Sequence, residues 1–185
     1  MSPLAHLTVA CWAVLEVGLR VREAVQGRGG RRRDRGTRVL IAISLGATIG
    51  AASLAPSVAP SLRTPAAVRG LGVIVMWLGL ATRVWAVAAL GRAFRTTVEV
   101  DPDQAVVTTG PYRWIRHPSY AGLLLIVAGL GLALGNWLSV VICLVLPPPA
   151  LVWRIHVEEA ELSRVLGDAY VAYRARTARL IPGLW

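Results

Sequence analysis

The sequence predicts an all-α integral membrane protein with about five transmembrane helices. The chain of 185 residues is 55% hydrophobic and only 16% charged, and its mean hydropathy of +0.57 is above that of ordinary soluble domains. Apolar runs recur along the chain with lengths near the roughly 20 residues that cross a bilayer as a helix. All twenty basic residues are arginine, and they gather between alternate runs.

Five apolar runs are the candidate spans. The first contains His6 and Glu16, the second carries no charge, and the third contains Arg83. The fourth is shorter than a full span needs, so it either begins earlier, near Pro118, or lies partly in the interface. The runs are Leu4–Leu19, Val39–Ala59, Val68–Leu90, Tyr120–Leu134 and Trp137–Trp153.

Local signals predict how the spans are connected and packed. Gly135-Asn136 is typical of a tight turn, so the last two runs form a C-terminal helical hairpin. The prolines at 147–149 remove backbone donors and should kink or break the fifth helix. The spacing of apolar residues over Glu158–Arg176 predicts a cytosolic amphipathic helix that forms part of a pocket. Gly46 and Gly50 are spaced as in the GxxxG pattern of closely packed helices.

The distribution of arginine predicts the orientation in the membrane. Five spans place seventeen arginines on one side and only Arg63 and Arg69 on the other. Because positive residues accumulate in cytoplasmic loops, we expect the N-terminus outside and the C-terminus in the cytosol. The run Arg31–Arg35 then lies near anionic headgroups. We expect no nucleic-acid partner, since no aromatic residues are interleaved with these arginines.

The remaining charges and the cysteines inside the apolar runs have structural interpretations. Glu16 precedes Arg20 by one helical turn and is expected to pair with it, whereas Arg83 is expected to extend toward the interface. Cys11 and Cys143 are interpreted as buried small hydrophobes, without a disulfide or a metal site. The first run lacks a basic leader region and a cleavage site, so we interpret it as a retained span.

Two polar clusters flank the hairpin, Gly110–Gly122 before it and Arg154–Glu159 after it. Charged groups beside long apolar spans usually mark a working site, and these two clusters can meet at one membrane face. Pro118 holds His117 extended and can start a helix. The helix N-terminus, with an arginine adjacent, would suit an anionic group such as a carboxylate. Alternatively, the arginines face lipid phosphates and His117 only caps the helix.

Glu158 and Glu159 are consecutive, so they point about 100° apart on a helix and only one of them faces a pocket easily. Arg154 lies one turn before Glu158 on the same face. Either these two side chains pair with each other, or Arg154 faces an anionic substrate while Glu158 holds a cofactor.

At these residues the chain resembles the isoprenylcysteine carboxyl methyltransferase family and its phospholipid methyltransferase relatives. The resemblance covers roughly residues 95–185, and its specificity lies in the combined pattern across the hairpin. The matching stretches are Gly110-Pro-Tyr-Arg113, Arg116-His-Pro-Ser-Tyr-Ala-Gly122, Arg154-x-x-x-Glu158-Glu159-x-x-Leu162, Gly167-x-x-Tyr170-x-x-Tyr173 and Arg179-Leu-Ile-Pro-Gly183.

The resemblance implies a membrane S-adenosylmethionine-dependent methyltransferase acting on a lipophilic acceptor, most of all the carboxylate of an isoprenoid- or lipid-like substrate. Arg154 matches the arginine that the family uses near the acceptor. If the acceptor is an amine, Glu159 or His156 is the nearest candidate base. Gln104 and Ala105 replace the usual His-Thr of the family. The implied cofactor contacts are Gln104, Ala105, Val106, Val107, Tyr112, His117, Pro118, Ser119, Tyr120 and Glu158, to which the argument for an anion site adds Arg116.

Charge logic describes the expected reaction. The donor carries a positive sulfonium and a carboxylate acceptor is negative, so charge is dispersed during transfer and a dry pocket favours it. Holding the acceptor in line with the methyl group is the main task. We expect residues 1–90 to be a scaffold and residues 91–185 to be the catalytic region. Membrane lipids and a lipophilic small molecule are the expected partners, with no obligate protein partner.

Three other functions are compatible with the sequence. A phospholipid or another lipophilic amine could be the acceptor. An NADPH-dependent enzyme similar to sterol reductases would share the C-terminal half, although the chain is short for their set of spans. A non-enzymatic membrane subunit is the third alternative.

Overall fold

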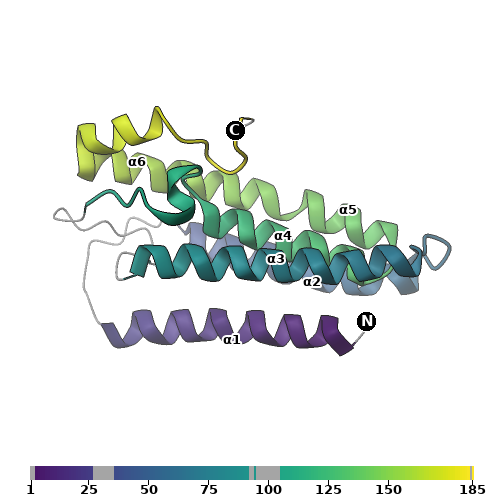
Figure 1. The fold of residues 1–185 in the computed structure, drawn as a ribbon. Helices are drawn as coiled ribbons and strands as arrows, with labels where there is room; N and C mark the ends of the chain where they lie inside the picture. Colours follow the sequence, from purple (N-terminus) through teal and green to yellow (C-terminus); the bar gives the residue numbers. More distant parts are fainter. Residues whose placement is uncertain (1–2, 27–35, 92–93, 95–104, 184) are drawn as a thin grey trace.

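The computed structural model describes residues 3–26, 36–91, 94, 105–183 and 185, and in these residues the fold is all-α, as predicted (Figure 1). The elements in chain order are α1 (Pro3–Gln26), α2 (Thr37–Val58), α3 (Ala66–Leu90), the short 3-10 helix η2 (Gly110–Arg113), α4 (Pro118–Ala133), α5 (Trp137–Val145) and α6 (Pro147–Arg174).

The helices have the lengths and compositions of a multi-pass integral membrane protein. α1, α2, α3 and the α5–α6 pair are each long and apolar enough to cross a bilayer. The 16 residues of α4 are apolar but fewer than a full span requires. In the described part of the chain, the sequence prediction of about five spans therefore corresponds to four full-length candidates and one shorter helix.

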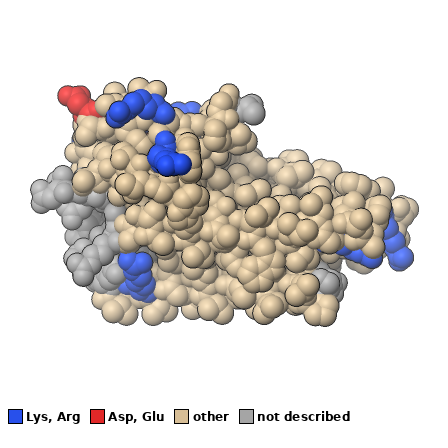
Figure 2. All heavy atoms as spheres, in the orientation of Figure 1, with Lys and Arg blue, Asp and Glu red and all other residues tan. Residues whose placement is uncertain are grey.

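The outer surface of the bundle is apolar. Side chains such as Val14, Ile43, Leu78 and Val141 are more than half exposed. On the face drawn in Figure 2, the charged side chains of the described residues lie toward the two ends, and a broad band without them lies between. Such an apolar band is stable in contact with lipid tails but would be unfavourable in contact with water.

α3 and α4 form the closest helix pair, and glycine makes their approach possible. A Cβ added to Gly79 would lie 2.6 Å from the carbonyl oxygen of Gly122, and one added to Gly72 would lie 2.7 Å from that of Gly129. Small residues let membrane helices come into backbone contact. The GxxxG pair at Gly46 and Gly50 does not have this role, because an added Cβ at either position meets nothing within 4 Å.

The turn between α4 and α5 is fixed by Asn136, which is fully buried. Its side-chain oxygen accepts from the Leu138 amide at 2.9 Å and caps α5, while its Nδ2 donates to the Ala59 carbonyl at 2.7 Å. Gly135 before it has a φ of 79°, which a glycine adopts without strain. The predicted turn therefore also ties the hairpin to the end of α2.

The last helix differs from the prediction in where it begins. α5 and α6 are separated at Leu146, directly before the three prolines, although the φ of −74° and ψ of −41° of Leu146 are still helical. The prolines therefore interrupt the hydrogen bonding of the helix, as predicted, without turning the backbone out of the helical region. However, α6 begins at Pro147 rather than near Glu158, because proline is well suited to the first turn of a helix. A second break occurs at Gly167, whose φ of 56° and ψ of −136° lie outside the helical region.

Candidate active site

A cavity of about 410 Å³ lies at the end of the bundle where α4 begins. It combines charged side chains with an apolar wall, as small-molecule sites commonly do. Its polar and ionisable lining is Glu16, Arg20, Arg38, Arg83, Tyr112, Arg116, His117, Ser119, Tyr120, Arg154, Glu158 and Tyr170, and its apolar lining includes Trp12, Ile41, Ala42, Leu45, Ile49, Leu90, Phe94, Val106, Val107, Leu123, Leu162 and Leu166.

The turn that opens α4 is held in place by the C-terminal tail. The amides of Arg116 and His117 donate to the carbonyls of Ala178 and Arg179 at 2.8 and 3.0 Å. Pro118 then occupies the first turn of α4. His117 before it has a φ of −124° and a ψ of 55°, which lie outside the helical and the extended regions, so the predicted extended backbone at His117 is wrong. This arrangement explains why a polar turn precedes an apolar helix here, and it presents His117, Ser119 and Tyr120 to the cavity.

Two of the amides at the N-terminus of α4, where the sequence predicts an anion site, are already used within the helix. The amides of Tyr120 and Ala121 both donate to the His117 carbonyl at 3.1 Å, so they do not point freely into the cavity. The His117 side chain forms no capping hydrogen bond either. It is 4% exposed, and its ring stacks on Tyr120 with centroids 5.6 Å apart.

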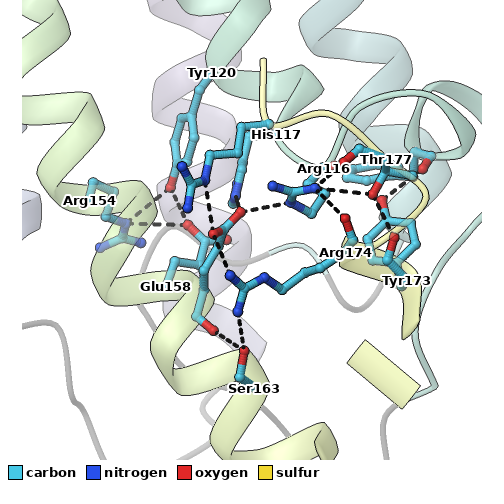
Figure 3. Close-up of polar contacts among 12 residues, drawn as sticks. Arg116, His117, Tyr120, Arg154, Glu158, Ser163, Tyr173, Arg174 and Thr177 are labelled. Atoms are coloured by element: carbon cyan, nitrogen blue, oxygen red, sulfur yellow. Dashed lines mark hydrogen bonds and ion pairs between the residues drawn. The ribbon is translucent and has the colours of Figure 1, made fainter. Parts of the chain in front are cut away.

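Glu158 faces the cavity within a short chain of polar contacts (Figure 3). The Tyr120 hydroxyl donates to Glu158 Oε2 at 2.7 Å, and Arg154 Nε donates to the Tyr120 oxygen at 3.0 Å. Arg154 Nε also lies 3.7 Å from Glu158 Oε2. On its other side, Arg154 Nη1 donates to the Thr37 hydroxyl of α2 at 3.0 Å. Arg154 is only 2% exposed, so α2 and α4 hold it rigidly against the cavity.

Glu159 points away from the cavity into a cluster of cations. Its Oε1 accepts from Arg116 Nε at 2.8 Å and lies 3.4 Å from His117 Nε2. Its Oε2 accepts from Arg179 Nε at 3.1 Å, and Arg174 Nη2 lies 4.0 Å away. A buried carboxylate with several charge-assisted hydrogen bonds is firmly fixed in its ionised form. Adjacent positions on α6 thus have different surroundings.

Arg83 and Glu16 form an ion pair that connects the N-terminal helix to the site. Arg83 Nε donates to Glu16 Oε1 at 2.6 Å, and Arg83 Nη1 donates to the Ser119 hydroxyl at 2.7 Å and to its carbonyl at 3.1 Å. Trp12 Nε1 donates to the same Glu16 oxygen at 3.0 Å. The predicted pairing of Glu16 with Arg20 and the predicted extension of Arg83 to the interface are therefore wrong. An ion pair with further hydrogen bonds makes a buried charge tolerable here.

Tyr112 closes the cavity from η2. Burial raises the pKa of its hydroxyl well above the ordinary value, and the nearby Glu158 carboxylate adds to this effect. The hydroxyl therefore stays protonated and can donate to a ligand. The backbone carbonyl of Tyr112 accepts from the Tyr173 hydroxyl at 2.7 Å, which anchors η2 to the last part of α6.

The structure places most of the predicted site residues on one cavity, but not all of them. Ala105 is exposed and Pro118 is buried, and neither lines the cavity, nor does Glu159. Gln104 lies outside the described residues. The predicted residues that do line it are Val106, Val107, Tyr112, Arg116, His117, Ser119, Tyr120, Arg154 and Glu158.

The sequence analysis did not assign Leu162, Leu166 and Tyr170 to the site, although their spacing carries a signal. Arg154, Glu158, Leu162, Leu166 and Tyr170 all line the cavity and follow one another at intervals of four residues. Residues four apart lie on neighbouring turns of one helix face. We call these five residues the α6 stripe. No comparable local signal identifies Arg83, because both of its partners are distant in sequence.

The sequence and the fold are similar to those of known methyltransferases. Residues 72–164, just over half of the chain, match the model of the isoprenylcysteine carboxyl methyltransferase (ICMT) family. The protein-S-isoprenylcysteine O-methyltransferase of Saccharomyces cerevisiae is 35% identical over 114 residues, which are 60% of this chain and 48% of that protein. Protein-S-isoprenylcysteine O-methyltransferase A of Arabidopsis thaliana is 31% identical over 66% of this chain and 64% of its own length.

A solved structure extends the similarity to the architecture. The eukaryotic intramembrane Ras methyltransferase ICMT matches 77% of this chain and 52% of its own chain, with a TM-score of 0.63 and 26% identity. The present chain spans about half of the length of the yeast relative and of this solved chain. The matched family segment contains η2, α4, α5 and most of the α6 stripe. The chain therefore belongs to the isoprenylcysteine carboxyl methyltransferase family.

Proposed function

We propose that the protein is a membrane methyltransferase that uses S-adenosylmethionine to methylate the carboxylate of an isoprenoid-like acceptor. The observation that carries this proposal is one cavity in which the buried Arg154 and the half-buried Tyr120 and Glu158 adjoin an apolar wall from α1 and α2. A lipophilic acid needs both an apolar surface for its tail and a fixed cation for its head group.

The residues around Glu158 fit the methyl donor. A partly exposed carboxylate can accept from ribose hydroxyls or from an amine, and Tyr112 provides a neutral donor nearby. Val106 and Val107 offer apolar contacts for a base. When bound, S-adenosylmethionine supplies a methyl group activated by a positive sulfonium. The residues assigned to hold it are Val106, Val107, Tyr112, Arg116, His117, Pro118, Ser119, Tyr120 and Glu158, with Arg116 and Pro118 acting through the turn that they stabilise.

The charge of the cavity favours an acidic acceptor over an amine. Among the described lining residues are five arginines, and only two carboxylates, Glu16 and Glu158, oppose them. Arg83 is paired with Glu16, and Arg116 is paired with Glu159 behind the wall. Arg154 contacts Tyr120, Thr37 and Glu158 at the cavity wall. We assign it to orient the acceptor carboxylate because it matches the arginine that the family uses near the acceptor.

This assignment removes the need for a general base. A carboxylate is already ionised near neutral pH and loses no proton on methylation. Glu159, which the sequence offered as a base for an amine, is occupied by Arg116 and Arg179. We therefore assign Glu159 a positioning role, because it holds Arg116 and His117 in the turn before α4. The chain contributes orientation and exclusion of water rather than proton transfer.

The membrane arrangement follows from the same assignments. We place the cavity at the cytosolic end, with the N-terminus outside, as the arginine distribution predicts. In this arrangement α4 is a short fifth helix and the last turns of α6 lie at the interface. Residues 91–185 carry most of the polar site, and residues 1–90 serve as scaffold and also supply the apolar wall and Glu16.

The test is methyl transfer by purified protein in lipid vesicles. The donor carries a deuterated methyl group, and the acceptors are an S-farnesylcysteine derivative and, separately, phosphatidylethanolamine. We expect mass spectrometry to find a labelled methyl ester on the cysteine derivative and no labelled amine. Labelling of the amine alone would overturn the assignment of Arg154, and binding of NADPH without binding of S-adenosylhomocysteine would overturn the reaction class.

A further inference from the structure

We propose that the Tyr170 hydroxyl is a ligand-binding group that hydrogen-bonds the adenosyl part of the methyl donor. This inference rests on the proposed function. It assigns a binding residue on the terminal part of α6, beyond the residue range matched by the family model.

The Tyr170 hydroxyl is buried and unpaired within the described protein. The residue is 3% exposed, and its oxygen has no hydrogen-bond partner among the described residues. A buried hydroxyl without a partner is costly, and most native proteins avoid it. The neighbouring tyrosines differ in this respect, because Tyr120 donates to Glu158 and Tyr173 donates to the Tyr112 carbonyl, both at 2.7 Å.

A ligand bound in the cavity can supply the partner that the Tyr170 hydroxyl lacks. Tyr170 lines the cavity as the last member of the α6 stripe. In an uninterrupted helix, steps of four residues advance about 40° each, so Tyr170 would face roughly 160° away from Arg154. The break at Gly167 redirects the helix, and the bond from Tyr173 to η2 fixes the last turns. The break at Gly167 and the hydrogen bond from Tyr173 to Tyr112 therefore both keep Tyr170 at the cavity.

The surroundings of Tyr170 suit a nucleoside better than the acceptor. Leu162 and Leu166 precede it on the stripe and, with Val106 and Val107, form apolar walls. The apolar side chains that suit an isoprenoid tail, Ile41 and Leu45 among them, come instead from α2. A flat base between apolar walls needs few polar contacts, and a tyrosine hydroxyl can both donate to and accept from its edge.

The experiment compares Tyr170→Phe with Tyr173→Phe in the purified full-length chain. Calorimetry measures the affinity for S-adenosylhomocysteine and for 5′-methylthioadenosine, which lacks the amino-acid portion. We expect Tyr170→Phe to weaken both ligands by about threefold to tenfold, the usual effect of one neutral hydrogen bond. The melting temperature of the ligand-free protein should not fall, since Phe removes an unpaired hydroxyl. Tyr173→Phe should lower it, because a buried carbonyl loses its partner.

The outcomes separate this inference from the proposed function. If the unmodified protein binds S-adenosylhomocysteine and Tyr170→Phe leaves both affinities unchanged, the inference is wrong and the proposed function stands. A fall in melting temperature like that of Tyr173→Phe would show that the hydroxyl has a structural bond instead. A loss of affinity for S-adenosylhomocysteine alone would move the contact to the amino-acid portion and overturn the adenosyl assignment. If the unmodified protein binds neither ligand, both proposals fail.

Discussion

Glu158 and Glu159 are neighbours in sequence, but they belong to two regions with different physical characters. The region around Glu159 is closed, because Arg116, Arg179 and His117 surround the carboxylate within the protein. The region around Glu158 is open, since this side chain is 28% exposed and lines the cavity. The comparison indicates that one carboxylate stabilises the fold and the other is available to a ligand.

The closed region also explains how the tail contributes to the site. Arg179 lies near the C-terminus, and the tail amides and carbonyls pair with Trp114, Arg116 and His117. Glu159 adds charge to these contacts from the opposite side. The turn before α4 is therefore held by the tail on one side and by Glu159 on the other. His117 keeps its orientation through these contacts, and Glu158 stays at the cavity.

Replacing Glu159 should produce the largest effect on stability. In Glu159→Gln, Arg116 and Arg179 lose their shared counter-charge, and breaking one side of a buried ion pair costs about 3–5 kcal/mol. Thermal unfolding followed by tryptophan fluorescence should show a clear decrease in the midpoint. Asp168→Asn is the matched control, because Asp168 is an exposed carboxylate on the same helix. Equal changes in both variants would contradict the proposed difference between the two regions.

Arg154→Gln should produce the largest effect on activity. This change removes the cation assigned to the acceptor carboxylate, and the loss of one positioned electrostatic group lowers turnover by about 100-fold to 1,000-fold. The affinity for S-adenosylhomocysteine should change less than the turnover. Arg113→Gln is the control, since Arg113 is exposed and stacks on Trp114. A large loss of donor affinity with little loss of turnover would place Arg154 on the donor.

Glu158→Gln should act on donor affinity and little on stability. A hydrogen bond to a charged group contributes about 1.5–3 kcal/mol, so we expect the dissociation constant of S-adenosylhomocysteine to rise by about tenfold or more. Tyr120 can still donate to the amide oxygen that replaces Oε2, and the lost pair with Arg154 is long, at 3.7 Å, and partly exposed. The melting temperature should therefore fall much less than in Glu159→Gln. A decrease in stability like that of Glu159→Gln would show that both carboxylates are structural.

Much of the fold could be predicted because its signals are local. Apolar runs predicted α1, α2 and α3 to within a few residues at most boundaries, and Gly135-Asn136 predicted the turn of the hairpin. Likewise, the prolines after Leu146 predicted the break between α5 and α6. These features depend on whether a residue has a backbone N–H donor and on whether a run of side chains is apolar, and both can be read from neighbouring residues in the sequence.

The missed features depend on partners that are distant in sequence. Glu16 has a basic residue one turn away, yet it pairs with Arg83, 67 residues later, because α3 places that guanidinium between α1 and Ser119. Glycine spacing alone also did not show that Gly79 and Gly122, rather than Gly46 and Gly50, lie at a close helix contact. Which of two adjacent carboxylates faces the cavity was open for the same reason.

Gly167→Ala should produce the smallest effect, and it tests whether the open region depends on the break in α6. The φ of 56° at Gly167 disfavours any residue with a Cβ, although nothing lies within 4 Å of the added atom. Gly18→Ala is the matched control, since the space there is equally open and the glycine lies within α1. We expect Gly167→Ala alone to weaken binding of S-adenosylhomocysteine, by about threefold if it displaces one neutral hydrogen bond.

The double variant Gly167→Ala/Tyr170→Phe shows whether Gly167 acts through Tyr170. If the break serves to place this hydroxyl, the two changes remove the same contact, and the double variant should bind no more weakly than Tyr170→Phe alone. If the fold-losses in affinity of the two single variants multiply in the double variant, the break also positions other members of the α6 stripe. An unchanged affinity in Gly167→Ala would mean that the last turns of α6 keep their position without the glycine, held by the bond from Tyr173 to the Tyr112 carbonyl.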